Sequence, residues 1–213
     1  MENNFTKKEF DEFYNIFEGE VEKKNTEIEK KFSASQIEFV SKEMLSYIVA
    51  ECLMEDIEMI SELKDKGFSK RYKDSIIRNM CEQIIQYLYI IKHQELIKEY
   101  FGEKIKKEWN GTNVFNGLKR TGGNRFEARK SVSEMASDIG EKKSDNDKIA
   151  LYDIYSVKAE LEHNSYFYHL LNEIGKLIDE NDKDYVELKD IEDIDYLYLV
   201  FMLTSFKRVY DTI

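Results

Sequence analysis

Residues 152–163 read YDIYSVKAELEH and combine a helical repeat with polar side chains that can react. At roughly 100° per residue, Tyr152, Ser156, Ala159 and His163 fall within about 40° of one another on a helix. A serine and a histidine on a core-facing stripe need partners, because a buried polar group without a hydrogen bond costs about 1–3 kcal/mol. The stretch therefore predicts a helix whose polar stripe is either a satisfied structural network or the wall of a site.

The fold class follows from the absence of proline in 213 residues. An average usage of about 5% would give roughly ten prolines. Their absence, together with only nine glycines, favours long uninterrupted helices. Apolar residues recur at every third and fourth position over most of the chain, which is the helical period. We expect an all-α single domain, residues 1–213, with six or seven helices around an antiparallel helical-bundle core.

Capping signals delimit the expected helices. Capping boxes, in which a Ser or Thr and a Glu three residues later bond each other's backbone N–H groups, are predicted at Thr6–Glu9 and Ser131–Glu134. Glycines 67, 102 and 140 are expected to end helices. The expected helices cover about 6–31, 35–66, 69–101, 131–140, 147–179 and 187–211.

Four of these helices, near 35–66, 69–101, 147–179 and 187–211, are expected to form the core. The N-terminal helix, within residues 1–33, is expected to be peripheral, because residues 22–31 are almost all charged or polar and can run into solvent or onto a protein partner. Its aromatic residues exceed one core face, which favours a homodimer.

Composition excludes several classes of function. The formal net charge of −11 disfavours nonspecific adhesion to nucleic acid or to an anionic membrane. No run approaches 18 apolar residues and the N-terminus has no secretion signal, so a cytoplasmic protein without membrane association is expected. Cys52 and Cys81 lack metal-ligand spacing and are interpreted as small buried hydrophobes in a reducing cytosol. The residue usage is typical of an AT-rich bacterial coding sequence.

Residues 103–130 differ from the rest of the chain. Eight basic residues oppose three acidic ones, giving a net charge of +5, and glycines and asparagines interrupt the helical pattern. The segment is interpreted either as a contact for an anion or nucleic acid or as an ordinary solvated loop. Under the first interpretation, the nucleic-acid-binding residues are Lys119, Arg120, Arg125, Arg129 and Trp109.

Three kinds of catalytic site are excluded by spacing. Glu160 and His163 form one ExxH pair, but a di-iron bundle needs a second, so no metal site is expected. No glycine-rich phosphate loop is present, and no cofactor is expected. Ser156 and His163 are two turns apart, about 10 Å along a helix axis, which is too far for a nucleophile and its base.

A family resemblance rests on the order of several short motifs. An apolar helix contains Arg78 and Glu82, residues 131–136 read SVSEMA before Gly140, and Tyr152, Tyr155, Ser156 and His163 follow. Over roughly residues 40–170 this order resembles a bacterial all-helical domain family of unknown function. That family is distantly similar to the HEPN superfamily (higher eukaryotes and prokaryotes nucleotide-binding), which includes abortive-infection proteins and toxins.

The resemblance implies a site and a function. HEPN ribonucleases share an Arg, four to six intervening residues and a His on one helix, with two copies meeting across a dimer. Here Lys158, four residues and His163 stand in that order, although lysine lacks the planar fork of arginine. The resemblance implies that His163 acts as acid or base, with Lys158 or Arg78 holding a scissile phosphate.

The remaining site residues implied by the resemblance are Ser156, Glu82 and Tyr155. Together they describe a metal-independent ribonuclease, or another effector acting on RNA or nucleotides, in phage defence or a toxin–antitoxin setting. The alternative is that His163, Ser156 and Tyr155 form a buried hydrogen-bond network. The protein is then a noncatalytic interaction module whose acidic helices and first helix bind a partner. The position of residues 103–130 relative to His163 distinguishes the two hypotheses.

Overall fold

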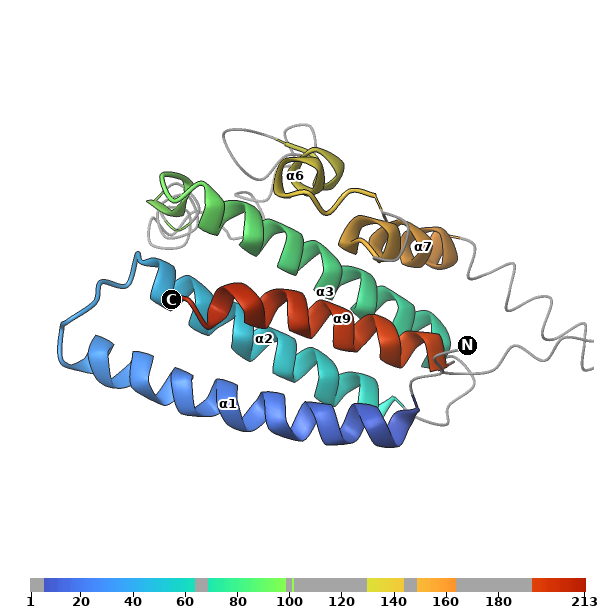
Figure 1. The fold of residues 1–213 in the computed structure, drawn as a ribbon, viewed down its shortest axis with the longest axis horizontal. Helices are drawn as coiled ribbons and strands as arrows, with labels where there is room; N and C mark the ends of the chain where they lie inside the picture. Colours follow the sequence, from blue (N-terminus) through green and yellow to red (C-terminus); the bar gives the residue numbers. More distant parts are fainter. Residues whose placement is uncertain (1–5, 64–68, 99–100, 102–129, 144–148, 164–192) are drawn as a thin grey trace, which may run out of the picture.

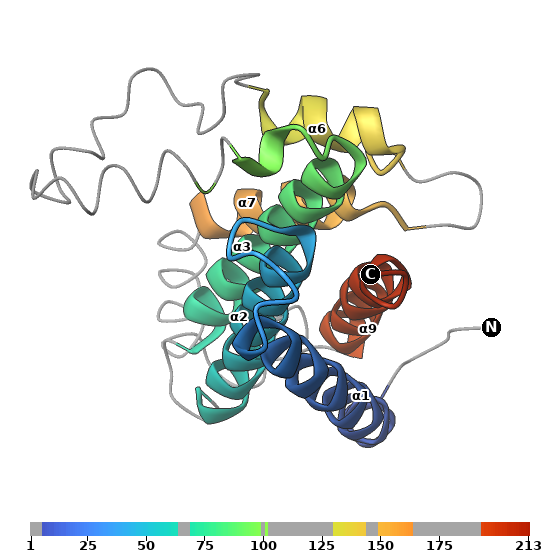
Figure 2. The ribbon, with the colours of Figure 1, turned by 90° about the vertical axis from the view of Figure 1, so that its left-hand side faces the viewer.

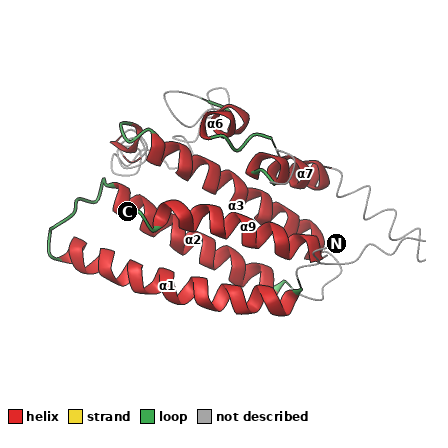
Figure 3. Ribbon diagram, in the orientation of Figure 1, coloured by secondary structure: helices red, strands yellow, loops and turns green. Residues whose placement is uncertain are grey.

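The computed structural model describes residues 6–63, 69–98, 101, 130–143, 149–163 and 193–213. All regular secondary structure in these ranges is helical, which confirms the all-α fold class (Figures 1 and 3). The principal helices are α1 (Lys7–Ser33), α2 (Lys42–Glu62), α3 (Ser69–Lys92), α6 (Val132–Ile139), α7 (Leu151–His163) and α9 (Asp193–Tyr210).

The helices form a bundle with an outer layer. Helices α1, α2, α3 and α9 pack together, and α6 and α7 lie on α3, away from α1 and α2 (Figures 1 and 2). Helix α3 is the shared element, since it packs against α2, α6, α7 and α9. The four-helix core differs from the prediction in one helix. The predicted core included the helix beginning near residue 147, whereas the observed core contains α1 in its place.

Aromatic packing explains why α1 belongs to the core. Phe17 is 1% exposed, and its ring lies 6.4 Å from that of Phe206 on α9. Phe10 lies 5.4 Å from Tyr196 at the other end of the same interface. Because rising residue numbers on α1 meet rising numbers on α9, these two helices run in the same direction. The bundle is therefore not antiparallel throughout.

Short connections account for the antiparallel pairs. Asn25 of α1 lies 2.6 Å from the Glu51 carboxylate of α2, and Glu29 lies 2.7 Å from the Tyr47 hydroxyl. Rising numbers on α1 thus meet falling numbers on α2, so these helices run in opposite directions. Helix α9 is reached only after α6, α7 and residues 164–192, which allows it to lie parallel to α1. Long crossover connections of this kind are common in helical bundles.

The capping predictions hold where the structure describes them. Both capping boxes are present, and Gly140 ends α6 with φ of 80°. Helix α2 begins at Lys42 rather than near 35, because the Ser41 hydroxyl accepts a hydrogen bond from the backbone N–H of Met44. Gly67 and Gly102 lie outside the described residues.

Two other helix ends differ from the sequence prediction. Helix α3 ends at Lys92, and the chain then tightens into turns in which the Leu96 N–H bonds the His93 carbonyl at 2.9 Å. Helix α7 begins at Leu151 rather than near 147. In its first turn the backbone N–H of Tyr152 donates a hydrogen bond to the Glu141 carbonyl, which follows α6. The part of the expected 147–179 helix beyond His163 lies outside the described residues.

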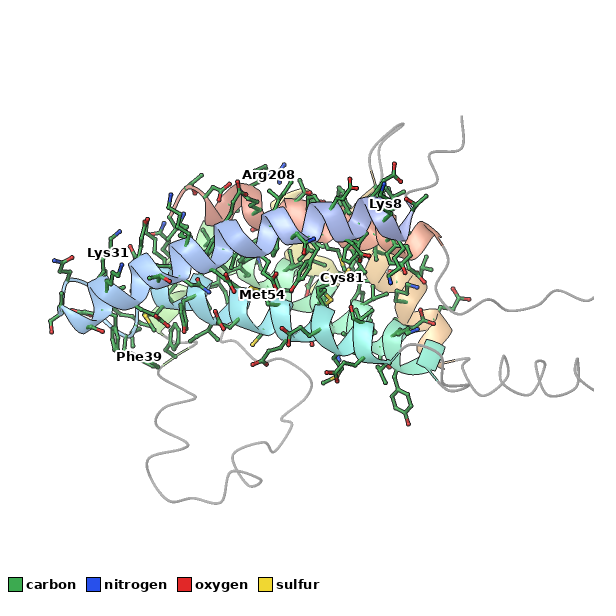
Figure 4. The ribbon with its side chains drawn as sticks, turned by 90° about the horizontal axis from the view of Figure 1, so that it is seen from below. Lys8, Lys31, Phe39, Met54, Cys81 and Arg208 are labelled. Atoms are coloured by element: carbon green, nitrogen blue, oxygen red, sulfur yellow. The ribbon has the colours of Figure 1, made fainter. Side chains whose placement is uncertain are left out.

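Several buried polar groups of the bundle form hydrogen bonds with one another. The hydroxyls of Ser46 and Tyr87 lie 2.9 Å apart, and Tyr210 donates to the Asn25 side-chain oxygen at 2.5 Å. Cys81 is fully buried and packs against Met202, as expected for a small hydrophobe, and Figure 4 places it in the interior. Among the described helices, none is long and apolar enough to cross a membrane.

The packing of α1 predicts a contrast between two of its residues. Phe17→Ala should lower the free energy of unfolding by about 3–5 kcal/mol, because it removes a buried ring and leaves a cavity against α9. Ile16→Ala, at a neighbouring side chain that is 65% exposed, should change it by less than about 0.5 kcal/mol. Urea unfolding followed by circular dichroism measures both. Similar small effects for the two variants would mean that α1 is peripheral after all.

Candidate functional site

Lys158 is the most deeply buried of the described residues that the sequence nominated for catalysis. It is 2% exposed, and its ammonium bonds the carboxylates of Asp74 on α3, at 2.6 Å, and Asp195 on α9. The two aspartates are 4% and 3% exposed. One cation and two carboxylates, from three helices, therefore meet inside the protein.

The charge balance of this triad keeps Lys158 protonated. Burial alone lowers the pKa of a lysine, but the carboxylates of Asp195 and Asp74 outweigh burial and hold the pKa of Lys158 above its ordinary value. The ring of Tyr198 lies 5.9 Å from the ammonium and closes another side. A cation enclosed in this way has no free face for a phosphate, which differs from the phosphate-holding role expected for Lys158.

A second polar cluster lies beside the triad, nearer the surface. The Arg78 guanidinium stands over the Tyr155 ring at 5.2 Å, and one of its nitrogens is 3.4 Å from the tyrosine hydroxyl. Glu82 lies 3.9 Å from Arg78 and accepts a hydrogen bond from Gln86 at 3.0 Å. About a quarter of the Arg78 side chain is exposed. The structure thus brings three of the six candidate catalytic residues, Arg78, Glu82 and Tyr155, together; the Arg78–Glu82 spacing was predicted from the sequence and the contact with Tyr155 was not.

Ser156 does not join either cluster. It is exposed, whereas Leu151, Ile154 and Lys158 form the buried side of α7. The predicted core-facing stripe through Ser156 is therefore wrong: the helix is rotated so that Leu151, Ile154 and Lys158 face the interior. The backbone of His163 ends α7, while its side chain lies outside the described residues, as do Trp109, Lys119, Arg120, Arg125 and Arg129.

The flanks of the basic segment lie at the far end of α3. Phe101 packs against Phe39 with ring centroids 5.5 Å apart, and the Lys130 ammonium lies 5.1 Å from the Tyr89 ring. Helix α7 instead runs toward the start of α3, where Lys158 meets Asp74. Fifteen residues separate Asp74 from Tyr89, which is about 22 Å along a helix. Phe101 and Lys130 therefore lie well away from Lys158, and residues 102–129 between them lie outside the described residues.

Polar contacts with Asp138 hold helix α6 at the same end of α3. The His93 ring nitrogen and the Asp138 carboxylate are 2.5 Å apart, and Lys92 lies 3.5 Å from that carboxylate. The hydrogen bond from His93 holds the pKa of Asp138 below its usual range. Within the part of the chain that the structure describes, no cluster of His, Cys, Asp and Glu has a metal-binding arrangement.

Sequence reasoning missed the two partners of Lys158. Asp74 and Asp195 stand in segments of ordinary helical pattern, 84 and 37 residues from Lys158, and neither has a local motif. The sequence did contain one signal for these partners. Lys158 follows Ile154 by four residues and so lies on an apolar stripe, and a lysine is almost never fully buried unless it is paired with a carboxylate.

Asp56 on α2 is a further perturbed carboxyl that the sequence did not indicate. One of its carboxylate oxygens is buried without a hydrogen-bond partner among the described residues. Burial, with a smaller contribution from the Glu55 charge, raises the pKa of Asp56 from 3.8 to about 6. We interpret this unpartnered carboxylate oxygen as a local cost to stability.

Comparisons with protein-family models, with curated proteins and with solved structures give no significant match for this chain.

The triad predicts a large effect of removing its cation. Lys158→Met should lower the free energy of unfolding by about 3–5 kcal/mol, because two buried carboxylates lose their counter-ion. Replacing all three residues together, with Lys158→Met, Asp74→Leu and Asp195→Leu, should recover most of this loss, since the three charges of the triad are removed together. Lys143→Met, at an exposed lysine, is the control. Chemical denaturation measures all three, and a loss for Lys158→Met no larger than the control's would contradict the buried ion pair.

Asp56 predicts a pH dependence of stability. Because its folded-state pKa of about 6 lies above its ordinary value of 3.8, its destabilising effect is absent below about pH 4 and complete above about pH 6. Asp56→Asn should therefore raise the free energy of unfolding by about 1–2 kcal/mol at pH 7.5, and by much less at pH 4. Thermal melts across this range test the difference, with the exposed Glu62→Gln as the matched control. Equal effects of Asp56→Asn at both pH values would exclude the assignment.

Proposed function

We propose that this chain is a noncatalytic helical interaction module that binds a partner protein. The observation that carries the proposal is the enclosure of Lys158 between Asp74 and Asp195, which occupies the one basic residue spaced like the arginine of HEPN ribonucleases. A phosphate could reach that ammonium only by displacing a buried carboxylate.

The charge of the bundle favours a protein partner. Helix α2 carries six acidic residues and one basic residue, and α1 carries eight acidic and six basic. Acidic surfaces repel the phosphates of nucleic acid and attract basic polypeptide segments. The two helices pack side by side in the bundle (Figure 4).

A second candidate is the HEPN-like effector acting on RNA or nucleotides, in phage defence or a toxin–antitoxin setting as the family resemblance implies. The observation that favours it is the partly exposed Arg78 guanidinium, held between Tyr155 and Glu82. Arginine grips a phosphate in two places, which a lysine does not. Under this proposal Arg78, rather than Lys158, holds the phosphate, His163 is the acid or base, and two copies form the site.

An RNA cleavage assay separates the two candidates. For an interaction module, the purified wild-type protein should leave a labelled single-stranded RNA intact, with and without a metal chelator. It should also copurify with a stoichiometric protein partner from its source cells, and His163→Ala should keep that partner. Cleavage by wild type that is lost in His163→Ala and in Arg78→Lys, at unchanged melting temperatures, would overturn the module and establish the effector.

A further inference from the structure

A hollow lies where the end of α1 meets the start of α2. It is lined by Glu29, Phe32 and Ser33 from α1 and by Met44 and Tyr47 from α2. Phe32 is 40% exposed, so its ring presents a face to solvent, whereas Met44 is 8% exposed and forms part of the floor. Figure 4 shows this end of the bundle, where Lys31 and Phe39 are labelled.

The lining combines aromatic rings with a carboxylate. The Tyr47 hydroxyl donates a hydrogen bond to the Glu29 carboxylate at 2.7 Å, which fixes the carboxylate beside the ring. That hydrogen bond, together with burial, raises the pKa of Tyr47 to about 12, so the phenol stays neutral. Phe39 extends the aromatic wall, with its ring 6.3 Å from that of Phe32. Rings and a carboxylate around one hollow favour a cation with an apolar stem.

The negative charge continues beyond the hollow along the seam between α1 and α2. Burial raises the pKa of Tyr14, and the charges of Glu18 and Glu22 on α1 and of Glu58 on α2 raise it further. Glu51 on α2 contributes in the same way to Tyr47. None of these four, nor Glu29, forms an ion pair with another described residue. The hollow is thus one end of an acidic track that is complementary to an extended basic segment.

We propose that this hollow binds a lysine side chain of a partner polypeptide. The lysine stem would pack on Phe32 and Met44, and its ammonium would meet the Glu29 carboxylate and the face of an aromatic ring. A polypeptide fits better than a free organic cation because further basic residues of the same segment would meet the acidic track. The inference rests on the proposed interaction function and names the chemistry of the partner.

Peptide binding tests the inference without knowledge of the natural partner. A fluorescent peptide of alternating lysine and alanine should bind the wild-type protein more tightly than serine–alanine and arginine–alanine peptides of the same length. Glu29→Gln and Phe32→Leu should each weaken lysine-peptide binding by about twofold to fivefold, the range expected when an exposed charge or cation–π contact is lost. Glu12→Gln removes an exposed carboxylate from another face of α1 and should have no effect.

Methionine methyl NMR supplies a second measurement that does not depend on the variants folding. The Met44 signal should shift when lysine peptide is added, while those of fully buried Met80 and Met202 should not. A loss of affinity in Glu12→Gln as large as in Glu29→Gln, or an unchanged Met44 signal, overturns the proposal. Equal competition by tetramethylammonium, or tighter binding of the arginine peptide, overturns the choice of a lysine polypeptide.

The inference and the proposed function fail in different ways. If a protein partner copurifies stably but lysine peptide does not bind, the proposed lysine site is wrong and the proposed interaction module stands. If lysine peptide shifts the Met44 signal and the protein also cleaves RNA in a His163-dependent way, the noncatalytic module is wrong. The hollow is then a binding site for a lysine side chain on an enzyme.

Discussion

The buried ammonium of Lys158 is the constraint on which the arrangement of the helices depends. It must find its counter-charges on α3 and α9 at the same time, because a buried cation without a partner is far less stable than one in water. Satisfying both aspartates fixes how far α7 slides along α3 and which side it turns inward. It also fixes where the start of α9 lies. A buried ion pair contributes little net stability, so its contribution here is to select one packing over its neighbours.

Apolar contacts made by helix α3 hold the same helices together. Its inner side packs on α2 and α9, and its outer side receives α6 and α7, so it is covered almost all round. This explains why Ile84, Ile85 and Tyr87, which point in different directions within one turn, are all fully or almost fully buried. A helix buried on every side tolerates no proline and gains little from surface charge. The absence of proline from the chain is consistent with this central role.

Features that depend on local chemistry were predictable from the sequence, and features that depend on distant partners were not. The capping boxes at Thr6 and Ser131, and the left-handed Gly140, follow from residues three or four positions apart. Which helices form the core could not be predicted from such local patterns. The aromatic stripe of α1 and the polar stripe of α7 both have helical period, and only the rings of α9 decide that α1 packs inside.

The same limit applied to the candidate site. Arg78 and Glu82 lie together because helical spacing places them on one side of α3, whereas the contact of Arg78 with Tyr155 depends on how α7 packs. Ser156 and Lys158 are two residues apart, so they point in nearly opposite directions on α7. Once Lys158 must face the aspartates, Ser156 must face solvent. One buried charge therefore determines which polar side chains of YDIYSVKAELEH remain accessible to a ligand or partner, and the residues nominated for chemistry are divided between the interior and the surface.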